Sequence, residues 1–165
     1  MGCDYCYQSF FGVSHDPRRG ARHAIALPAD VTNASDWQQT VEACVKKFGR
    51  LDIVVNNAGT SHLNQPLLDV SEQEFDRVFA VNVKSIYLSA QAAVPIMRSQ
   101  GGGVFINIGS TAALRPRPGL AWYNGTKGAV HVISRTMAVE LAPDKIRVCV
   151  IAPVAGETPL LQTFM

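Results

Sequence analysis

The chain has 165 residues, 47% of them hydrophobic, and a formal net charge of +2. This composition indicates one soluble globular domain, and the near-neutral charge gives no reason to expect a nucleic acid or an anionic membrane as a partner. Four scattered cysteines are too few for a disulfide framework, which favours a reducing, cytoplasmic setting. No membrane-length apolar run is expected, because Lys84 and Pro95 interrupt the longest candidate, and no metal site is predicted.

The chain opens with an atypical, aromatic-rich segment over residues 1–19. The apolar run His23–Val31 follows and suits a buried strand. Ser35 and Gln38 have the spacing of a capping box, so they predict the start of a helix that ends at Gly49.

Strands and helices alternate in the rest of the chain. Leu51–Val55 is a second buried strand, and a polar turn at residues 56–59 comes directly after it. Ser71 and Glu74 form another capping box, which opens a long helix that reaches Met97. The remaining predicted elements are a strand, a helix and a strand at Val104–Ile108, Tyr123–Leu141 and Ile146–Ile151.

This alternation predicts an α/β fold, a partial Rossmann-like doubly wound parallel sheet with helices on both faces. In such sheets the ligand lies at the carboxyl ends of the strands. The conspicuous polar residues follow the four predicted strands at those ends, namely Asp30, Asn56–Gly59, Ser110 and Pro153–Thr158. The sequence therefore predicts that residues distant along the chain converge on one edge of the sheet.

Tyr123 and Lys127 stand four positions apart, so a helix places both on the same face. A tyrosine titrates near about 10, and work as an acid or base near neutral pH requires a pKa lower by roughly three units, or about 4 kcal/mol. A positive charge about 4 Å away contributes a similar amount at an effective dielectric constant of about 20. The pair is therefore sufficient for general acid–base catalysis.

Six motifs together resemble the middle and later part of the short-chain dehydrogenase/reductase family. Ser110 precedes Tyr123 by 13 positions, which fits the spacing in that family. The combination is far more specific than any one of its members. The motifs are Asp30-Val31, Asn56-Asn57-Ala58-Gly59, Asn82-Val83, Gly109-Ser110, Tyr123-Asn124-Gly125-Thr126-Lys127 and Pro153–Thr158.

The resemblance implies an NAD(P)-dependent oxidoreductase, with residues 20–165 as a partial NAD(P)-binding domain. Tyr123 would exchange a proton with an alcohol or ketone substrate while hydride moves to or from the nicotinamide. Ser110 would hydrogen-bond the same substrate oxygen. Lys127 would lower the pKa of Tyr123 and hold the nicotinamide ribose, and Asn82 would position a water that links Lys127 to solvent.

The resemblance also implies a set of cofactor-binding residues, for NAD or for NADP. Ordinary turn chemistry explains an Asn or a Gly after a strand equally well, and Thr158 also suits a plain loop position. The implied residues are Asp30, Val31, Asn56, Ala58, Gly59, Tyr123, Lys127, Pro153 and Thr158.

Other parts of the family pattern have no counterpart. No glycine-rich phosphate-binding turn precedes Asp30, and the chain stops at Met165 before the final strand of the family. The alternative expectation is therefore a catalytically inactive truncated fragment, or a non-catalytic partner of full-length subunits. Leu51–Val55 would then have an open edge, which Tyr5–Val13 could cover.

Two further expectations concern association and substrate. The predicted helices at Phe75–Met97 and Tyr123–Leu141 are apolar on more than one face, and the corresponding helices of the family pair across a two-fold axis. A homo-oligomer that forms through these helices is therefore expected. The expected substrate pocket is apolar or mixed, and its predicted lining is Ala112, Leu114, Trp122 and His62.

Overall fold

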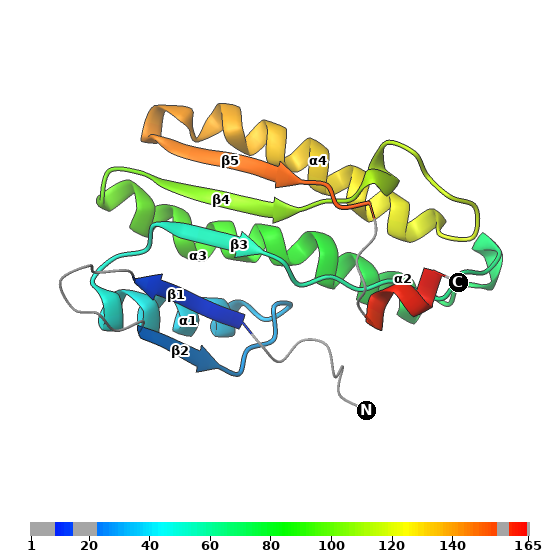
Figure 1. Cartoon of the computed structure of the whole chain (residues 1–165), viewed down its shortest axis with the longest axis horizontal. Helices are drawn as coiled ribbons and strands as arrows, with labels where there is room; N and C mark the ends of the chain where they lie inside the picture. Colours follow the sequence, from blue (N-terminus) through cyan, green and yellow to red (C-terminus); the bar gives the residue numbers. More distant parts are fainter. Residues whose placement is uncertain (1–8, 15–22, 155–158, 165) are drawn as a thin grey trace.

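The computed structural model describes residues 9–14, 23–154 and 159–164 (Figure 1). It is an α/β protein, which confirms the predicted fold class. A parallel sheet contains β3 (Ile53–Asn56), β4 (Gly103–Ile108) and β5 (Ile146–Ile151) in the order β3-β4-β5. A separate antiparallel pair contains β1 (Ser9–Ser14) and β2 (His23–Leu27).

The helices follow the strands in the predicted alternation. None of those in the described ranges is long and apolar enough to span a membrane. The α-helices are α1 (Ala34–Phe48), α2 (Glu72–Phe79), α3 (Ser85–Ser99) and α4 (Ala121–Glu140). A π-helix, η2 (Ala80–Lys84), joins α2 to α3, and the 3₁₀ turns are η1 (Leu67–Asp69), η3 (Thr111–Ala113), η4 (Ala142–Asp144) and η5 (Pro159–Phe164).

The N-terminal strands are arranged differently from the prediction. The His23–Val31 run was expected in the parallel sheet, but β2 pairs antiparallel with β1, from Ser9 opposite Leu27 to Ser14 opposite His23. Two strands this close in sequence can pair as a hairpin, whereas a parallel neighbour needs a long crossover connection. β1, which contains the described part of the Tyr5–Val13 segment, lies between β2 and β3 in Figure 1, but it pairs with β2 and not with β3. Tyr5 itself lies outside the described residues.

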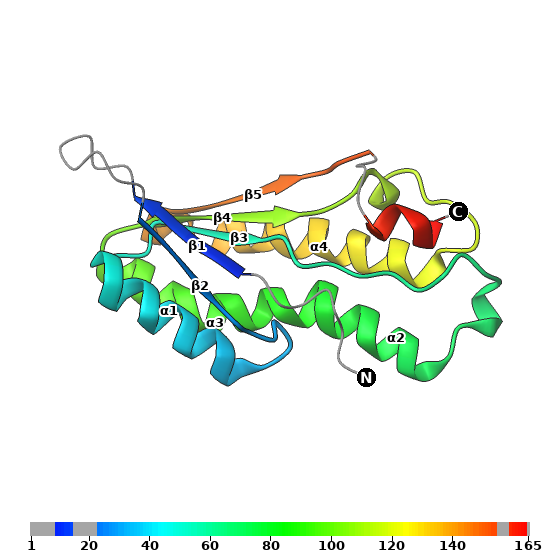
Figure 2. The ribbon, with the colours of Figure 1, turned by 60° about the horizontal axis from the view of Figure 1, so that its bottom comes forward.

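The helices lie on one side of the parallel sheet (Figure 2). α3 packs against β3 and β4, α4 packs against β4 and β5, and α1 packs against α3. On the other side, Ile53, Val55 and Ile151 are 54%, 52% and 52% exposed. The sequence predicted helices on both faces of this sheet. In the described part of the chain, helices cover one face (Figure 2).

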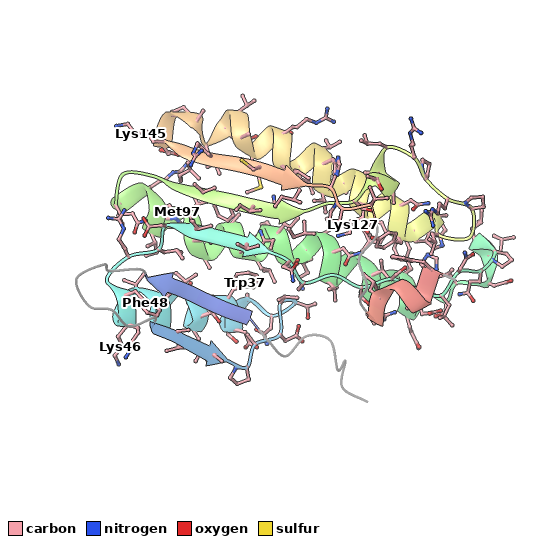
Figure 3. All side chains as sticks on the ribbon, viewed as in Figure 1. Trp37, Lys46, Phe48, Met97, Lys127 and Lys145 are labelled. Atoms are coloured by element: carbon pink, nitrogen blue, oxygen red, sulfur yellow. The ribbon has the colours of Figure 1, made fainter. Side chains whose placement is uncertain are left out.

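The core lies between this sheet and its helices. Phe105 of β4 and Met97 of α3 are fully buried, and Trp37 and Phe48 extend the packing along α1 (Figure 3). A Cβ atom at Gly103 would lie 2.5 Å from Met97 Sδ, so a larger residue at the start of β4 would force the buried Met97 side chain to move. The core therefore fixes the sheet and the long helices relative to one another.

The helix starts test the two predicted capping boxes. At α2, Glu74 N–H donates to Ser71 Oγ at 3.2 Å, which confirms Ser71 as the N-cap. At α1 the prediction of Ser35 is wrong, because Asn33 is the N-cap and its Oδ1 accepts the Ser35 N–H at 2.9 Å. Asn is among the preferred N-cap residues, and Asn33 has the extended backbone that this position needs.

Candidate active site

The four predicted catalytic residues converge at the carboxyl edge of the parallel sheet. Ser110 directly follows β4, Asn82 lies in η2, and Tyr123 and Lys127 lie on the first turns of α4. The turn after β3 reaches the same place, because a Cβ at Gly59 would lie 3.6 Å from Asn82 Oδ1 and 3.6 Å from Lys127 Nζ. The predicted meeting of distant segments is thus present in the structure.

Asn82 joins the β3 turn to α4 through its buried side chain. Its Oδ1 accepts the Thr60 N–H at 2.8 Å, and its Nδ2 donates to Thr60 O at 2.8 Å and to Thr126 Oγ1 at 3.0 Å. Thr126 Oγ1 in turn donates to Tyr123 O at 2.7 Å. The amide of Asn82 therefore fixes the position of the Tyr123 turn relative to the sheet.

Asn82 has this position because the long helix is not α-helical throughout. Within Ala80–Lys84 the bond pattern widens, and Ser85 N–H donates to Ala80 O five residues back. Single π-turns of this kind occur mostly inside α-helices and frequently at functional sites. The sequence predicted one continuous helix here and did not predict the π-turn.

Lys127 is a buried cation, only 5% exposed. Its Nζ donates to Ile108 O at 2.8 Å, and Figure 3 places it between α4 and the carboxyl end of β4. Burial disfavours the charged amine and lowers the pKa of Lys127 to about 8. His131, one turn further along α4, has its pKa lowered first by burial and then by the charges of Arg135 and Lys127.

Tyr123 is also buried, and its pKa moves in the direction opposite to the one predicted. Desolvation raises the pKa above the ordinary tyrosine value, and a hydrogen bond with the Ser110 side chain lowers it by a smaller amount. Lys127 Nζ lies 5.9 Å from the centre of the Tyr123 ring. The prediction of a lowered Tyr123 pKa is therefore wrong for this structure, because desolvation of the buried phenol is the larger of its two influences.

Ser110 is held in an extended conformation at the end of β4. Its Oγ accepts the Ala112 N–H at 3.1 Å, which caps the short turn η3. The hydroxyl proton remains for a second bond, and the phenol of Tyr123 is a partner of the same side chain. Ser110 and Tyr123 can consequently bond the same oxygen atom placed between them.

Several predicted cofactor-binding residues border the same edge. Asn56 Nδ2 donates to Asn107 Oδ1 at 2.8 Å, and Asn107 Nδ2 donates to Ser134 Oγ at 2.8 Å. Asn56 Oδ1 is buried and has no hydrogen-bond partner in the described part of the chain. Pro153 O accepts the Thr111 N–H at 3.1 Å, which brings the loop after β5 beside Ser110. Ala58 packs against the hydrophobic core.

Asp30 and Val31 lie just before α1 and make local contacts there. The carboxylate of Asp30 accepts the N–H and the hydroxyl of Thr32, each at 2.8 Å, and Val31 O accepts the indole N–H of Trp37 at 2.9 Å. Asp30 N–H donates to Asp36 Oδ2 at 2.7 Å. Two carboxylates thus occupy this helix start, which does not suit a phosphate. Thr158 lies outside the described residues.

The predicted pocket lining is only partly supported. Trp122 packs edge-on against Phe75 with ring centres 5.3 Å apart, and its indole N–H donates to Leu67 O at 3.2 Å. Leu114 is largely exposed, whereas His62 is fully buried. A cavity of about 840 Å³ adjoins this region, and its lining includes Leu67, Pro118 and Asn124 but neither Tyr123 nor Ser110.

Four residues of the site were missed by the sequence analysis. Thr60 and Thr126 complete the Asn82 network, and Arg77 Nη2 donates to Ser61 O at 3.0 Å while its Nη1 donates to Thr60 Oγ1. Thr60 directly follows the Asn56–Gly59 motif, and Thr126 lies within the Tyr123–Lys127 motif, but the sequence analysis assigned roles to other residues of these motifs. Asn107 had a usable signal, because a polar residue within the apolar strand Val104–Ile108 needs a buried partner.

Comparison with known proteins places these residues in a family. The profile of the short chain dehydrogenase family matches residues 13–165. The 4-formylbenzenesulfonate dehydrogenase TsaC1/TsaC2 of Comamonas testosteroni is 46% identical over 142 residues, which cover 86% of this chain and 56% of that protein. The cyclopentanol dehydrogenase of Comamonas testosteroni is 38% identical over 148 residues, which cover 90% of this chain and 59% of that protein.

A solved structure agrees in fold. The 3-ketoacyl-(acyl-carrier-protein) reductase from Brucella melitensis, complexed with NADH, has 48% identity and a TM-score of 0.82, and the match covers 84% of this chain and 59% of that one. The chain therefore spans less than two thirds of the length of the relatives it matches. On the family match over residues 13–165 and these identities, the chain belongs to the short-chain dehydrogenase/reductase family.

Proposed function

We propose that the chain is part of an NAD(P)-dependent oxidoreductase that interconverts an alcohol and its ketone or aldehyde. The observation that carries this proposal is the convergence of Tyr123, Ser110 and a buried Lys127 at one sheet edge. A buried cation and a buried phenol are costly to a fold, and such groups cluster at functional sites. Membership of a dehydrogenase family points to the same chemistry.

The proposed roles follow from the position of each group. Tyr123 gives a proton to the carbonyl oxygen during reduction and accepts it during oxidation. Ser110 donates its hydroxyl proton to the same oxygen and stabilises the charge that develops there. Lys127, whose pKa is about 8, can gain or lose a proton near neutral pH and so exchange protons with the site. Asn82 holds the Tyr123 turn in place through Thr126.

The nicotinamide cofactor would supply or accept the hydride. The residues of this edge fit the nicotinamide end of such a group. Gly59 places no side chain beside Lys127 Nζ, and the unpartnered Asn56 Oδ1 can accept a hydrogen bond. The described residues offer no glycine-rich turn for the pyrophosphate, and the α1 start is taken by Asp30 and Asp36.

The substrate is proposed to carry a ring. Two relatives are named for ring-bearing compounds, 4-formylbenzenesulfonate and cyclopentanol. In this chain the ring of Phe164 lies 5.0 Å from that of Tyr123, so an apolar, flat wall borders the proposed acid. A cyclic or aromatic alcohol or aldehyde would pack against this wall.

The chain is further proposed to associate with copies of itself through α3 and α4. Tyr87 of α3 and Val132 and Val139 of α4 are more than half exposed, although all three are large and apolar. Burial of such side chains against a second copy would remove apolar area from water. Sedimentation as a dimer or larger species supports this, and a clean monomer at high micromolar concentration contradicts it.

A second candidate function is a non-catalytic partner of longer subunits. It is favoured by the absence of a glycine-rich turn from the described ranges and by the carboxylates at the start of α1. Under this alternative the chain would bind no nicotinamide cofactor by itself and would turn over no substrate.

Titration with NADH and NADPH separates the two functions. The oxidoreductase proposal expects saturable binding, followed by the fluorescence of the cofactor, that Lys127→Met weakens at least about ten-fold by removing a charge-assisted contact. Lys84→Met is the matched control, because Lys84 is exposed on the π-turn and lies outside the proposed site. Absence of binding for both cofactors, with the protein folded by circular dichroism, would reject the first function in favour of the second.

A further inference from the structure

A short C-terminal turn covers the phenol of Tyr123. The turn is η5 (Pro159–Phe164), and both ribbon views place it near the start of α4 (Figures 1 and 2). The rings of Phe164 and Tyr123 are 5.0 Å apart and tilted by 50°. Tyr123 is 5% exposed, so the cover contributes to an almost complete exclusion of water from the phenol.

Asn64 holds this cover with two hydrogen bonds. Its backbone N–H donates to Thr163 O at 3.0 Å, and its side-chain Nδ2 donates to Phe164 O at 3.2 Å. Both acceptors are main-chain carbonyls of the turn that carries the Phe164 ring. Asn64 therefore fixes the backbone from which that ring projects.

Asn64 also contacts the loop that precedes Tyr123. Gly119 has a φ of +78°, and a Cβ atom at this position would collide with Asn64 Oδ1. The neighbouring Gln65 N–H donates to Gly119 O at 3.0 Å. Asn64 and Gln65 thus connect the cover on one side with the residues just before α4 on the other.

We propose that Asn64 is a positioning residue that ties the Pro159–Phe164 cover to the loop before Tyr123, so that Phe164 encloses the phenol. An asparagine suits this role because it combines a side-chain donor for Phe164 O with a short, flat amide that fits against the α-carbon of Gly119. The enclosure of the phenol stands on the contacts above. Its effect on substrate selection rests on the proposed function.

The electrostatic consequence is measurable without any cofactor. Burial is the larger cause of the raised pKa of Tyr123. If Asn64 keeps the cover in place, its loss admits water to the phenol, and the pKa of Tyr123 falls towards the ordinary tyrosine value. Lys127, whose Nζ lies 5.9 Å from the centre of the Tyr123 ring, stays in place in such a variant.

The first test is a ¹⁹F NMR titration of protein that contains 3-fluorotyrosine, with the Tyr123 resonance assigned by its loss in Tyr123→Phe. The expected result is a lower pKa of Tyr123 in Asn64→Ala and in Phe164→Leu. Leu63→Ala is the matched control, because Leu63 is the exposed neighbour of Asn64 and should leave the titration unchanged. An unchanged Tyr123 titration in both folded test variants would overturn the proposal.

Hydrogen–deuterium exchange gives a second readout. Loss of one hydrogen bond of ordinary net strength should speed exchange of the peptide that contains η5 roughly two- to ten-fold in Asn64→Ala. Exchange within α4 should not change, and a general increase across the chain would indicate a merely structural role. If the Tyr123 pKa falls in these variants but no cofactor binds, this proposal stands and the proposed function is rejected. If cofactor binds but the Tyr123 pKa does not change, the proposed function stands and this proposal is rejected.

Discussion

The two faces of the parallel sheet are built differently. On one face Val54 and Phe105 are buried under α3 and α4, while on the other Ile53, Val55 and Ile151 are more than half exposed. The candidate catalytic residues come from the helices of the covered face and from the ends of the strands. The comparison teaches that, within the described residues, the covered face and the strand ends are what hold Tyr123 and Lys127 in place.

The covered face also carries the buried polar contacts. Asn56, Asn107 and Ser134 form a chain of hydrogen bonds that crosses from β3 to β4 and on to α4. Buried polar groups of this kind are costly unless they are paired. These hydrogen bonds therefore favour one alignment of β3, β4 and α4 relative to one another. The exposed face presents apolar side chains without such a constraint.

The largest expected difference between the faces is in stability. Phe105→Ala should lower the free energy of unfolding by about 3–5 kcal/mol, because it leaves a cavity among fully buried neighbours. Val55→Ala, on the open face of the adjacent strand, should cost less than about 1 kcal/mol. Urea unfolding followed by circular dichroism measures both, and equal losses would show that the open face is buried in solution.

A smaller effect concerns the buried cation of the covered face. The pKa of Lys127 is lowered from 10.5 to about 8, which corresponds to a burial penalty of about 3 kcal/mol for the charged form. Between these pH values the unfolded chain binds more protons than the folded one, so stability rises with pH. The penalty is complete below about pH 8 and is relieved as the pH rises through that value.

Lys127→Met removes the penalty, offset in part by the lost bond to Ile108 O. The difference in unfolding free energy between this variant and the wild type should therefore shrink by about 2 kcal/mol from pH 8 to 9.5. Parallel stability curves for the two proteins would mean that Lys127 is solvated.

The smallest effect is expected on the open face itself. Ile53→Thr should change the free energy of unfolding by less than about 0.5 kcal/mol, since more than half of the side chain is already in water. It should reduce the binding of a dye that reports exposed apolar surface. A large loss of stability instead would show that this residue is buried by another part of the protein or by a second copy.

Local patterns predicted what depends on local chemistry. The strands β4 and β5 and the N-cap Ser71 follow from apolar runs and cap spacing, and the convergence of Ser110 with Tyr123 follows from the strand ends. Asn33 was missed as a cap because two residues of similar capping preference lie two positions apart, and only the backbone conformation chooses between them.

The remaining differences are tertiary in origin. Pairing of β2 with β1 depends on which strand edge is available, which no local pattern records. The direction of the Tyr123 pKa depends on how completely other segments bury the phenol, and Phe164 is 41 positions away in the chain. The sequence could identify the Tyr123–Lys127 pair, but not how completely other segments bury the phenol.

The π-turn at Ala80–Lys84 has a consequence for how this segment can change in evolution. The turn holds one residue more than an α-helical turn, so it rotates everything after it relative to α2. A one-residue deletion here would leave an unbroken α-helix and yet turn Asn82 or the whole buried stripe of α3 away from its partners. Lineages of this chain should therefore tolerate side-chain exchange in this stretch more readily than any gain or loss of a single codon.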